Sequence, residues 1–309
     1  MAQVTVSQEW LQRNMTEMLG KMIENTLPDY DGQIIFDTPI LGMGDGDAEA
    51  FSLLRGAVGE EHFHPRALLS CHARPGADLS SVTVVSWALP FAEEVRRSNR
   101  REDRPSRLYS LARNNGGAVN HLLRKRMVLL LREKGLEAVA PAVTRGYNAF
   151  RSKDHVFSSN WSERHVAWAA GLGVFGLNGC LITSKGTSVR FGSVVTNLQP
   201  PVSKEDVPQP FAPCLEDKGG QCGRCIARCP VGAISRDGLD KSKCYAMRNR
   251  IRREHLSEYE AELSLLRSPI VKSGKREQGY SLGCALCMHG VPCEDKDPQP
   301  RTTVCSISS

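Results

Sequence analysis

The sequence predicts an α+β protein of two parts, an α/β domain over residues 1–200 and a smaller cysteine-rich domain over residues 201–309. Three observations support this prediction. Before residue 200, runs of β-branched residues alternate with long helical patterns, which is typical of mixed helix and sheet layers. The stretch 199–210 is rich in proline and indicates a linker. Nine of the eleven cysteines lie after residue 213.

The first domain contains clear periodic segments. Apolar residues recur at helical spacing over residues 7–26, and β-branched residues over 82–89 predict a buried strand. A long helical pattern covers 106–134 and is expected to break at the Asn-Asn-Gly-Gly run, 114–117. Residues 137–143 are expected to form a further strand.

A glycine run, residues 171–176, formally satisfies G-x-G-x-x-G. A dinucleotide-binding turn needs a strand before the glycines and a helix after them. Here residues 160–170 predict a helix, and the segments 179–183 and 189–195 predict a hairpin. A nicotinamide site is therefore not expected. The sequence leaves open a second interpretation, in which these glycines line the binding surface of another large cofactor. Glycine permits this because it lets backbone amides approach a ligand.

Composition excludes several classes of protein. With 40% hydrophobic and 24% charged residues, the chain is neither disordered nor fibrous. No apolar run is long enough to span a membrane, and the first residues do not resemble an export signal, so we expect a cytoplasmic protein with no membrane partner. The net charge of +6 does not by itself indicate nucleic-acid binding.

The cysteine spacing carries the chemistry. Cys222-x2-Cys225-x3-Cys229 followed by proline is close to the ferredoxin run C-x2-C-x2-C-x3-C-P, whose thiolates hold [4Fe–4S] clusters and whose last cysteine reaches the other cluster. Cys214 stands upstream in place of the usual first cysteine. A second set begins at Cys244 and continues downstream as C-x2-C-x5-C.

Eight cysteines are enough for two four-iron clusters. With the fourth ligands crossed, we predict that cluster 1 is held by Cys214, Cys222, Cys225 and Cys293. We predict that cluster 2 is held by Cys229, Cys244, Cys284 and Cys287. A four-thiolate zinc site is the alternative, but it would leave four of these cysteines unused. The remaining cysteines, Cys71, Cys180 and Cys305, are expected not to be ligands, and a basic helix over about 245–267 is expected between the two sets.

The segment 162–178, followed by 181–183, 192–196 and the two cysteine sets, resembles epoxyqueuosine reductases and corrinoid-dependent reductive dehalogenases. The resemblance runs from Ser162 to Pro298. It implies a nitroreductase-like α/β domain that binds cobalamin, ahead of a bacterial-ferredoxin-like domain, with one cluster near the corrinoid. It also implies a set of cofactor-binding residues, namely Gly171, Leu172, Gly173, Gly176 and Asn178.

Two departures from the family pattern are visible. Epoxyqueuosine reductases carry an aspartate before the Glu-Arg pair as a proton donor, whereas the stretch 157–161 contains no acid. The family's lysine in G-K-N is replaced by Leu177. The resemblance therefore implies a divergent member of the superfamily.

Together these features predict an iron–sulfur reductase that passes electrons from two clusters to a corrinoid and on to an electrophilic small-molecule or nucleoside-like substrate. A low-potential ferredoxin or flavodoxin would supply the electrons. Tyr147 is the preferred proton donor, with Arg145 expected to lower its pKa, and His165 is a further catalytic candidate. One alternative is an electron-transfer or activating protein for a partner enzyme. A weaker alternative is a tRNA queuosine-type reductase.

Two further groups of side chains, one of arginines and one of histidines, each have two possible roles. The arginines between Arg96 and Arg107 are either a phosphate clamp for a corrinoid tail or RNA, or a solvated face. Nucleic acid is thus left open as a partner without being favoured. His62 and His64 are either a metal pair or part of an ordinary loop.

Overall fold

The computed structural model describes residues 6–100, 103–150, 156, 158–200, 214, 222–263, 268–272 and 275–298. The helices are α1 Gln8–Gly20, α2 Glu49–Val58, α3 Pro65–Ser70, α4 Glu93–Ser98, α5 Arg107–Glu133, α6 Glu163–Ala169, α7 Arg224–Ala227 and α8 Lys241–Leu263. The 3-10 turns are η1 Ile23–Asn25, η2 Pro28–Tyr30, η3 Pro141–Val143 and η4 Leu286–Met288.

The strands are β1 Thr26–Leu27, β2 Gln33–Ile34, β3 Ile40–Asp45, β4 Thr83–Pro90, β5 Ala138–Val139, β6 Ala149–Phe150, β7 Ser158–Ser159, β8 Gly173–Phe175, β9 Leu181–Thr183, β10 Val189–Thr196, β11 Ile234–Ser235, β12 Gly238–Leu239, β13 Ser268–Lys272 and β14 Lys275–Gly279. The predicted strand at 82–89 is confirmed as β4. The predicted strand at 137–143 is only two residues long, because Pro141 starts a 3-10 turn there.

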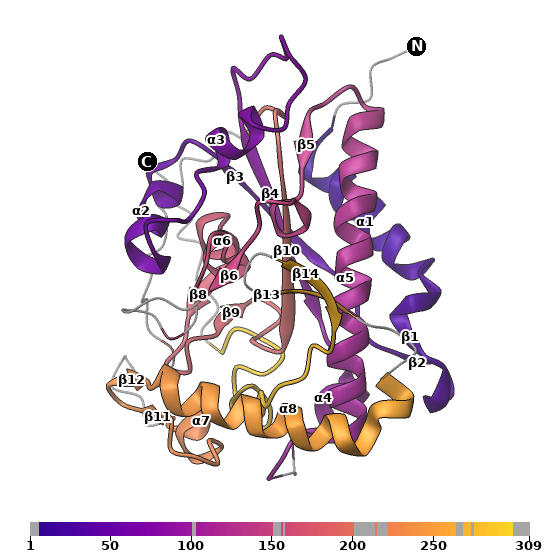
Figure 1. Cartoon of the computed structure of the whole chain (residues 1–309), viewed down its shortest axis with the longest axis vertical. Coiled ribbons are helices and arrows are strands. Elements are labelled where there is room, and N and C mark those ends of the chain that lie inside the picture. The colour runs from indigo at the N-terminus through magenta and orange to yellow at the C-terminus, as the bar shows by residue number, and fades with distance from the viewer. Residues whose placement is uncertain are drawn as a thin grey trace, which may run out of the picture.

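A four-stranded sheet in the order β3-β4-β10-β5 forms the centre of the larger part (Figure 1). Every neighbouring pair in it is antiparallel. The α/β expectation for the first domain is therefore wrong in detail, since a sheet of that class is mostly parallel, and the α+β class holds for the whole chain. All eight residues of β4 are buried, because helices cover both faces of the sheet.

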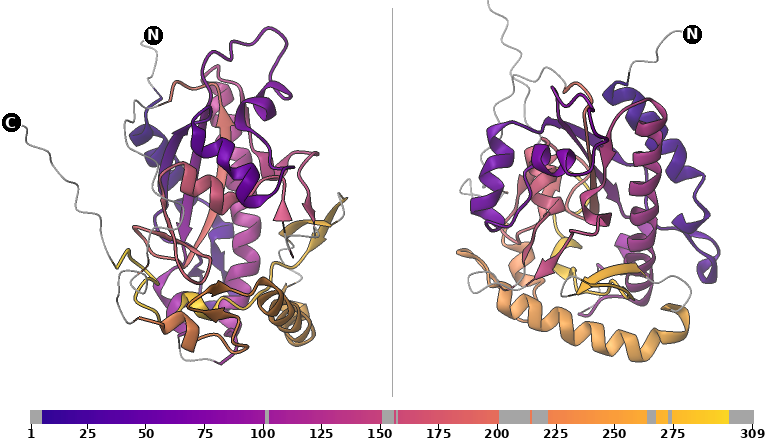
Figure 2. Two further views of the ribbon diagram at one scale, coloured as in Figure 1. Left: turned by 90° about the vertical axis from the view of Figure 1, so that its left-hand side faces the viewer. Right: turned by 45° about the horizontal axis from the view of Figure 1, so that its top comes forward.

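The two faces of the sheet carry separate layers of helices. On one face, α1 and α5 bury Leu11 and Leu123 against Trp87. On the other face, α2 and α6 bury Phe51 and Val166 in a second apolar cluster. Figure 2 shows these layers from the side and in a view tilted so that the top comes forward.

Helix α5 runs unbroken for 27 residues, so the expected break at 114–117 is wrong. Ser106 caps it by accepting the N–H of Tyr109 at 3.1 Å. Gly116 is needed for packing, since a Cβ there would lie 2.5 Å from the Phe36 ring. Asn120 accepts the Trp87 indole N–H at 2.9 Å and donates to the Phe191 carbonyl at 2.8 Å. Tertiary contacts outweigh the low helix propensity of these residues.

On the side of β10 that pairs with the short strand β5, side chains of α5 contact the part of the strand that β5 does not reach. Strand β5 pairs with β10 at Val195 and Thr196 only. Earlier in the strand, the Phe191 carbonyl accepts from Asn120 and, at 3.1 Å, from Arg124. The Phe191 carbonyl at this edge is thus satisfied by two side chains of α5.

The predicted hairpin between 179–183 and 189–195 is wrong. Strand β9 pairs with β8 instead, and β10 pairs with β4. The β8–β9 pairing is possible because Gly173 has no side chain, since a Cβ there would lie 2.1 Å from the Ile182 carbonyl oxygen. The glycine run is therefore partly a strand.

Helix α8 is the helix expected between the cysteine sets, and it crosses one end of the molecule (Figure 1). His255 is fully buried and its Nδ1 lies 2.8 Å from the Ser110 hydroxyl of α5. Leu263 of α8 belongs to the same apolar cluster as α1 and α5. The cysteine-rich part therefore packs directly on the larger part. No helix within the described residues has the length and apolar character needed to cross a bilayer.

Candidate iron–sulfur site

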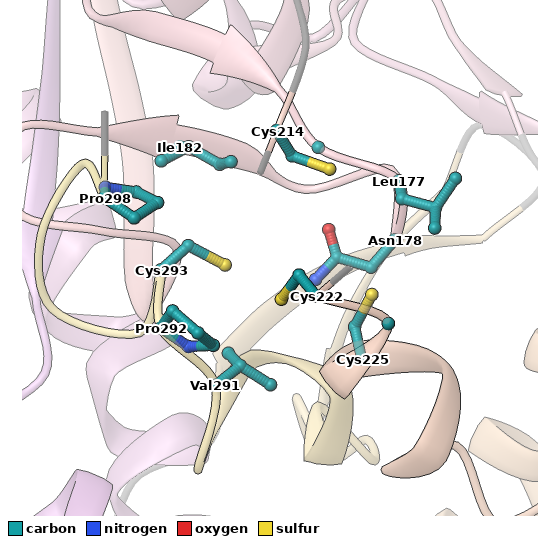
Figure 3. Close-up of a pocket in the computed structure, with 12 residues that line it drawn as sticks. Leu177, Asn178, Ile182, Cys214, Cys222, Cys225, Val291, Pro292, Cys293 and Pro298 are labelled. Carbon is teal, nitrogen blue, oxygen red and sulfur yellow. The ribbon is translucent and has the colours of Figure 1, made fainter. Parts of the chain in front are cut away.

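The four cysteines predicted for cluster 1 line one pocket. Figure 3 shows their sulfur atoms directed toward a common space from separate segments of the chain. The pocket holds about 390 Å³ of empty space, counting its opening to solvent. Its lining comprises Gly176, Leu177, Asn178, Ile182, Cys214, Cys222, Gly223, Cys225, Val291, Pro292, Cys293 and Pro298. Four thiols around one space are the donor set that a four-iron cluster requires.

Two backbone hydrogen bonds hold the loop that contains Cys293. The Thr187 N–H donates to the Cys293 carbonyl at 2.8 Å, and the Ser188 N–H donates to the Glu294 carbonyl at 3.0 Å. The Glu294 carboxylate is 3% exposed and accepts from Arg100 Nε at 3.0 Å. The unusual x5 spacing before Cys293 thus belongs to a loop that is tied to the larger part of the protein.

The cysteines predicted for cluster 2 also lie near one another. Burial raises the pKa of Cys284, and the thiols of Cys244 and Cys229 raise it further. A hydrogen bond with Cys180, together with burial, raises the pKa of Cys287 well above its ordinary value. Thiols in such surroundings stay neutral, and the positive charge of a bound iron–sulfur core is what would let them ionise. Within the described residues, no three Cys, His, Asp or Glu side chains converge closely enough to hold a single metal ion.

The turn between Cys222 and Cys229 has the local geometry of a ligand loop. Gly223 takes a left-handed conformation with φ 50°, and α7 follows it immediately. The Ala233 N–H donates to the Cys229 sulfur at 3.2 Å. Backbone N–H bonds to sulfur are among the features that tune an iron–sulfur cluster. Burial and the neighbouring Cys214 and Cys222 raise the pKa of Cys225 to about 11.

Cys180 lies between the two sets, which the sequence did not predict. A hydrogen bond with Cys287 and the positive charge of Arg164 bring the pKa of Cys180 down to about 7. Burial and then Cys180 raise the pKa of Cys293 to about 12. Cys180 belongs to no spacing motif, so only its place after the glycine run could have drawn attention to it. Cys71 is exposed, and Cys305 is outside the described residues.

The glycine run reaches this site at its far end. Gly176 and Asn178 line the first pocket. The Asn178 amide donates to the Cys287 carbonyl at 3.0 Å and accepts the Cys180 N–H at 3.0 Å. The sequence assigned this asparagine to a corrinoid, whereas its hydrogen bonds in the structure go to cysteine backbones.

The start of the glycine run has other surroundings. Gly171 is exposed, with φ 76° and open space beside it. Leu172 packs against β3, where a Cβ on Gly42 would lie 3.0 Å from its Cγ. The space where Gly173 would carry a side chain is filled by Ile182. The expectation that a ligand approaches the backbone at this glycine is therefore wrong.

The three predicted catalytic residues are not brought together. Burial and Glu163 raise the pKa of Tyr147, so the expectation that Arg145 lowers it is wrong. Arg145 is exposed. His165 Nδ1 lies 2.7 Å from the Ser162 hydroxyl, and burial lowers its pKa to about 3, which leaves the ring neutral at pH 7. In the part of the chain that the structure describes, no hydrogen bond or ring contact joins Tyr147 to either residue.

Glu163 is a half-buried residue whose structural contacts the sequence could not distinguish from those of a surface acid. Its carboxylate accepts from Arg124 of α5 at 2.8 Å and from the Ser193 hydroxyl at 2.7 Å. Burial raises its pKa, which Arg124 and Ser193 oppose. The partners lie about 30 or more residues away, so local spacing carries no signal for them.

Arginines between Arg96 and Arg107, for which the sequence left two interpretations, make ion pairs within the protein. Within the arginine stretch, Arg100 meets Glu294, Arg104 meets Glu258 and Arg107 meets Glu262. These three guanidinium groups therefore have carboxylate partners in the structure. The phosphate clamp for a corrinoid tail or RNA stays a prediction.

His62 is a core histidine. Its Nε2 accepts the Ser162 N–H at 3.1 Å, and its ring stacks on Trp161 with centroids 5.4 Å apart. Burial lowers its pKa to about 4. A ring nitrogen that already accepts a backbone N–H is not available to a metal ion.

No protein-family model matches the chain. Among curated proteins, an epoxyqueuosine reductase of Bacillus anthracis is 38% identical over 96 residues, which cover 30% of this chain and 23% of the relative. An epoxyqueuosine reductase of Bacillus subtilis is 32% identical over 118 residues, covering 37% of this chain and 28% of the relative. One from Gloeobacter violaceus is 29% identical over 162 residues, covering 52% and 44%. The chain thus matches less than half the length of these relatives.

Solved structures give a similar result. The crystal structure of epoxyqueuosine reductase with a tRNA-Tyr epoxyqueuosine-modified tRNA stem loop has a TM-score of 0.48 at 17% identity, covering 95% of this chain and 68% of that one. The selenomethionine-labelled epoxyqueuosine reductase has a TM-score of 0.46 at 17% identity, covering 94% and 70%.

Proposed function

We propose that this chain is an iron–sulfur oxidoreductase whose two cysteine sets hold two [4Fe–4S] clusters. The observation that carries the proposal is the convergence on one pocket of four thiols, three from residues 214–225 and one from Cys293. The mutual proximity of the thiols in the second set supports it. The similarity to proteins named epoxyqueuosine reductase supports the reductase class.

The proposed ligands keep the crossed arrangement. Cluster 1 would be held by Cys214, Cys222, Cys225 and Cys293. Cluster 2 would be held by Cys229, Cys244, Cys284 and Cys287. When bound, such clusters supply one-electron transfer at potentials set by charge, hydrogen bonds to sulfur and solvent exposure. The chain contributes the burial of the thiols, the Ala233 N–H bond to sulfur and the two backbone hydrogen bonds that hold the Cys293 loop.

The substrate is proposed to be an electrophilic small molecule or nucleoside, with electrons supplied by a low-potential ferredoxin or flavodoxin. Tyr147 remains our proposed proton donor. Because its pKa is raised, the phenol keeps its proton at neutral pH and would release it only to a strongly basic site on the reduced substrate. Among the described residues, neither Arg145 nor His165 makes a hydrogen bond or ring contact with Tyr147.

The glycine run gives little support for bound cobalamin. The glycines that the resemblance places beside a corrinoid do not fit one well, since Gly173 packs on Ile182 and Asn178 holds cysteine backbones. Titration of the protein with cob(II)alamin under anaerobic conditions tests the family expectation, which requires a change in the cobalt spectrum.

A tRNA reductase is the second candidate, and the name of the curated relatives is the observation that favours it. It predicts that tRNA shifts the protein in a gel at physiological salt. An electron-transfer protein for a partner enzyme predicts that reduced protein passes electrons to that partner and reduces no small electrophile.

Iron analysis tests the main proposal. Protein reconstituted without oxygen should contain about eight Fe per chain, four for each cluster. Cys222→Ser and Cys284→Ser should each retain about half of this iron, whereas Cys71→Ser, an exposed control, should retain all of it. Bound zinc in place of iron, or full iron retention in both ligand variants, would contradict the proposal.

A further inference from the structure

Helix α8 carries its charges in two separate halves. Residues 241–253 contain six lysines and arginines and no acid, whereas residues 254–263 contain four glutamates and neither lysine nor arginine. The dipole of a helix favours acids in the first turn and cations in the last, and α8 has neither. This charge order does not stabilise the helix itself, so the two halves have to be explained by what they contact.

The acidic half contacts the larger part of the protein. Glu258 accepts from Arg104 at 3.0 Å, and Glu262 accepts from Arg107 at 2.9 Å. Arg107 is the first residue of α5. The glutamates therefore hold this end of α8 against the larger part, and their place in the helix is explained within the chain.

The basic half presents cations to solvent. Lys243, Arg250 and Arg253 are exposed, and their spacing of seven and three residues places them on one side of the helix. We call these three residues the basic face of α8, which lies at the lower edge of the molecule in Figure 1. The nearest acids, Asp240 at 3.8 Å from Lys243 and Glu254 at 3.6 Å from Arg250, form exposed ion pairs, which contribute little.

The other side of the same helix carries a proposed cluster ligand. Cys244 shares a side of α8 with Met247 and Ile251, which are 5% and 1% exposed. The basic face and Cys244 are therefore separated by no more than the thickness of a helix with its side chains, about 10–12 Å. Ala246, which lies between Lys243 and Arg250 in the chain, is exposed and small, so it leaves room for a partner to approach the helix closely.

This position suits a protein that donates electrons. Electron transfer becomes steeply slower with distance, so the redox centre of a donor has to come close to the cluster that it reduces. Exposed cations attract an anionic partner, raise its rate of association and orient it. RNA is anionic as well, but it delivers no electrons, so contact with RNA does not require a cluster ligand on the same helix.

We propose that the basic face of α8 is the docking surface for an acidic redox protein that reduces the second cluster. One electron passes from the reduced partner to the cluster, and no covalent bond forms or breaks. This inference rests on the proposed function, since it needs a cluster in the second set.

Stopped-flow mixing of anaerobically reconstituted protein with reduced flavodoxin of net negative charge tests the inference. The Arg250→Glu/Arg253→Glu variant should have a second-order rate constant at least about tenfold lower at low salt, because steering raises association rates by about 10–10³. Arg13→Glu/Lys125→Glu is the matched control. It changes the net charge by the same amount, at exposed positions on α1 and α5, and should keep the wild-type rate constant.

Salt provides a second measurement that needs no variant. Raising the ionic strength from about 0.01 M to about 1 M shortens the Debye length from about 30 Å to about 3 Å. The wild-type rate constant should therefore fall steeply over this range. A rate constant that does not respond to salt would overturn the inference.

Iron content separates failure of the inference from failure of the proposed function. If wild-type protein binds no second cluster, the proposed function fails. If the α8 variant keeps its iron and reacts with flavodoxin as fast as the control variant, the inference is overturned. It is also overturned if the α8 variant loses binding to tRNA in a gel while its rate constant is unchanged, since the basic face then binds RNA. Full reduction of the α8 variant by photoreduced deazaflavin, together with slow reduction by flavodoxin, supports the inference.

Discussion

The side-chain amide of Asn178 donates a hydrogen bond to the backbone carbonyl of Cys287 at 3.0 Å. The same asparagine lines the pocket of the first cysteine set, while Cys287 belongs to the second. One buried side chain, 4% exposed, therefore connects the two candidate cluster sites through the end of the glycine run.

Replacement of Asn178 should weaken both sites. Asn178→Ala leaves the Cys287 carbonyl and the Cys180 N–H without their partner, and an unsatisfied buried polar group costs about 1–3 kcal/mol. We expect a lower free energy of unfolding by about that amount in urea titrations, with faster loss of iron to a chelator. Asn14→Ala, which removes one hydrogen bond within α1, is the control. Equal chelation rates in the two variants would argue against the link.

Gly186 should be indispensable for the Cys293 loop. It has φ 75°, and a Cβ there would lie 2.3 Å from the Glu294 carbonyl oxygen. Gly186→Ala should therefore displace the loop and reduce the iron content by up to half. Gly76→Ala is a matched control, since Gly76 also has a left-handed φ, 80°, but nothing lies within 4 Å of the added atom. Both variants carry the conformational strain, so the difference between them is the contact with the Glu294 and Asp295 backbone.

His62 should make stability depend on pH. Burial lowers its pKa to about 4 in the folded protein, whereas an unfolded histidine titrates near 6.5. Between these values the unfolded chain binds a proton that the folded chain does not. The free energy of unfolding should therefore fall as pH drops from about 6.5 to about 4, with a contribution of up to about 1.4 kcal/mol per pH unit. His62→Gln should reduce this slope in urea titrations read by tryptophan fluorescence, with the remainder coming from other buried histidines such as His165. An unchanged slope would refute the assignment.

Cys180 should be dispensable for iron binding even though it contacts Cys287. Cys180→Ser is expected to keep about eight Fe per chain, because eight other cysteines complete both proposed clusters. Cys287→Ser should lose about half of the iron. A loss of iron from Cys180→Ser as large as that from Cys287→Ser would make Cys180 a ligand and require a different assignment of the second set.

Local patterns in the sequence predicted the elements that depend on local chemistry. Strand β4 followed from its run of β-branched residues, and the proximity of Cys222 and Cys225 followed from their spacing. The pairing of β8 with β9 did not, because it depends on the fit of Gly173 against Ile182. The sequence also failed to predict that α5 is unbroken. Gly116 lies within this helix because the Phe36 ring leaves no room for a side chain there, and that contact comes from the tertiary structure.

The spacing of the cysteines predicted which of them share the first pocket, namely Cys214, Cys222, Cys225 and Cys293. The ligand roles of all eight cysteines stay predictions, and the surroundings of the site were not predicted. Arginines near Cys284 come from α5, β10 and α8, and no sequence pattern connects Arg113 with Arg190 or Arg248. Charges brought together from distant segments are a property of the tertiary structure.

The short strand β5 leaves most of β10 without a neighbouring strand on that side, and Asn120 and Arg124 occupy the Phe191 carbonyl there. A free strand edge is a template for pairing with another molecule. At Phe191, the long helix α5 thus supplies the hydrogen-bond donors that a further strand of the sheet would otherwise provide.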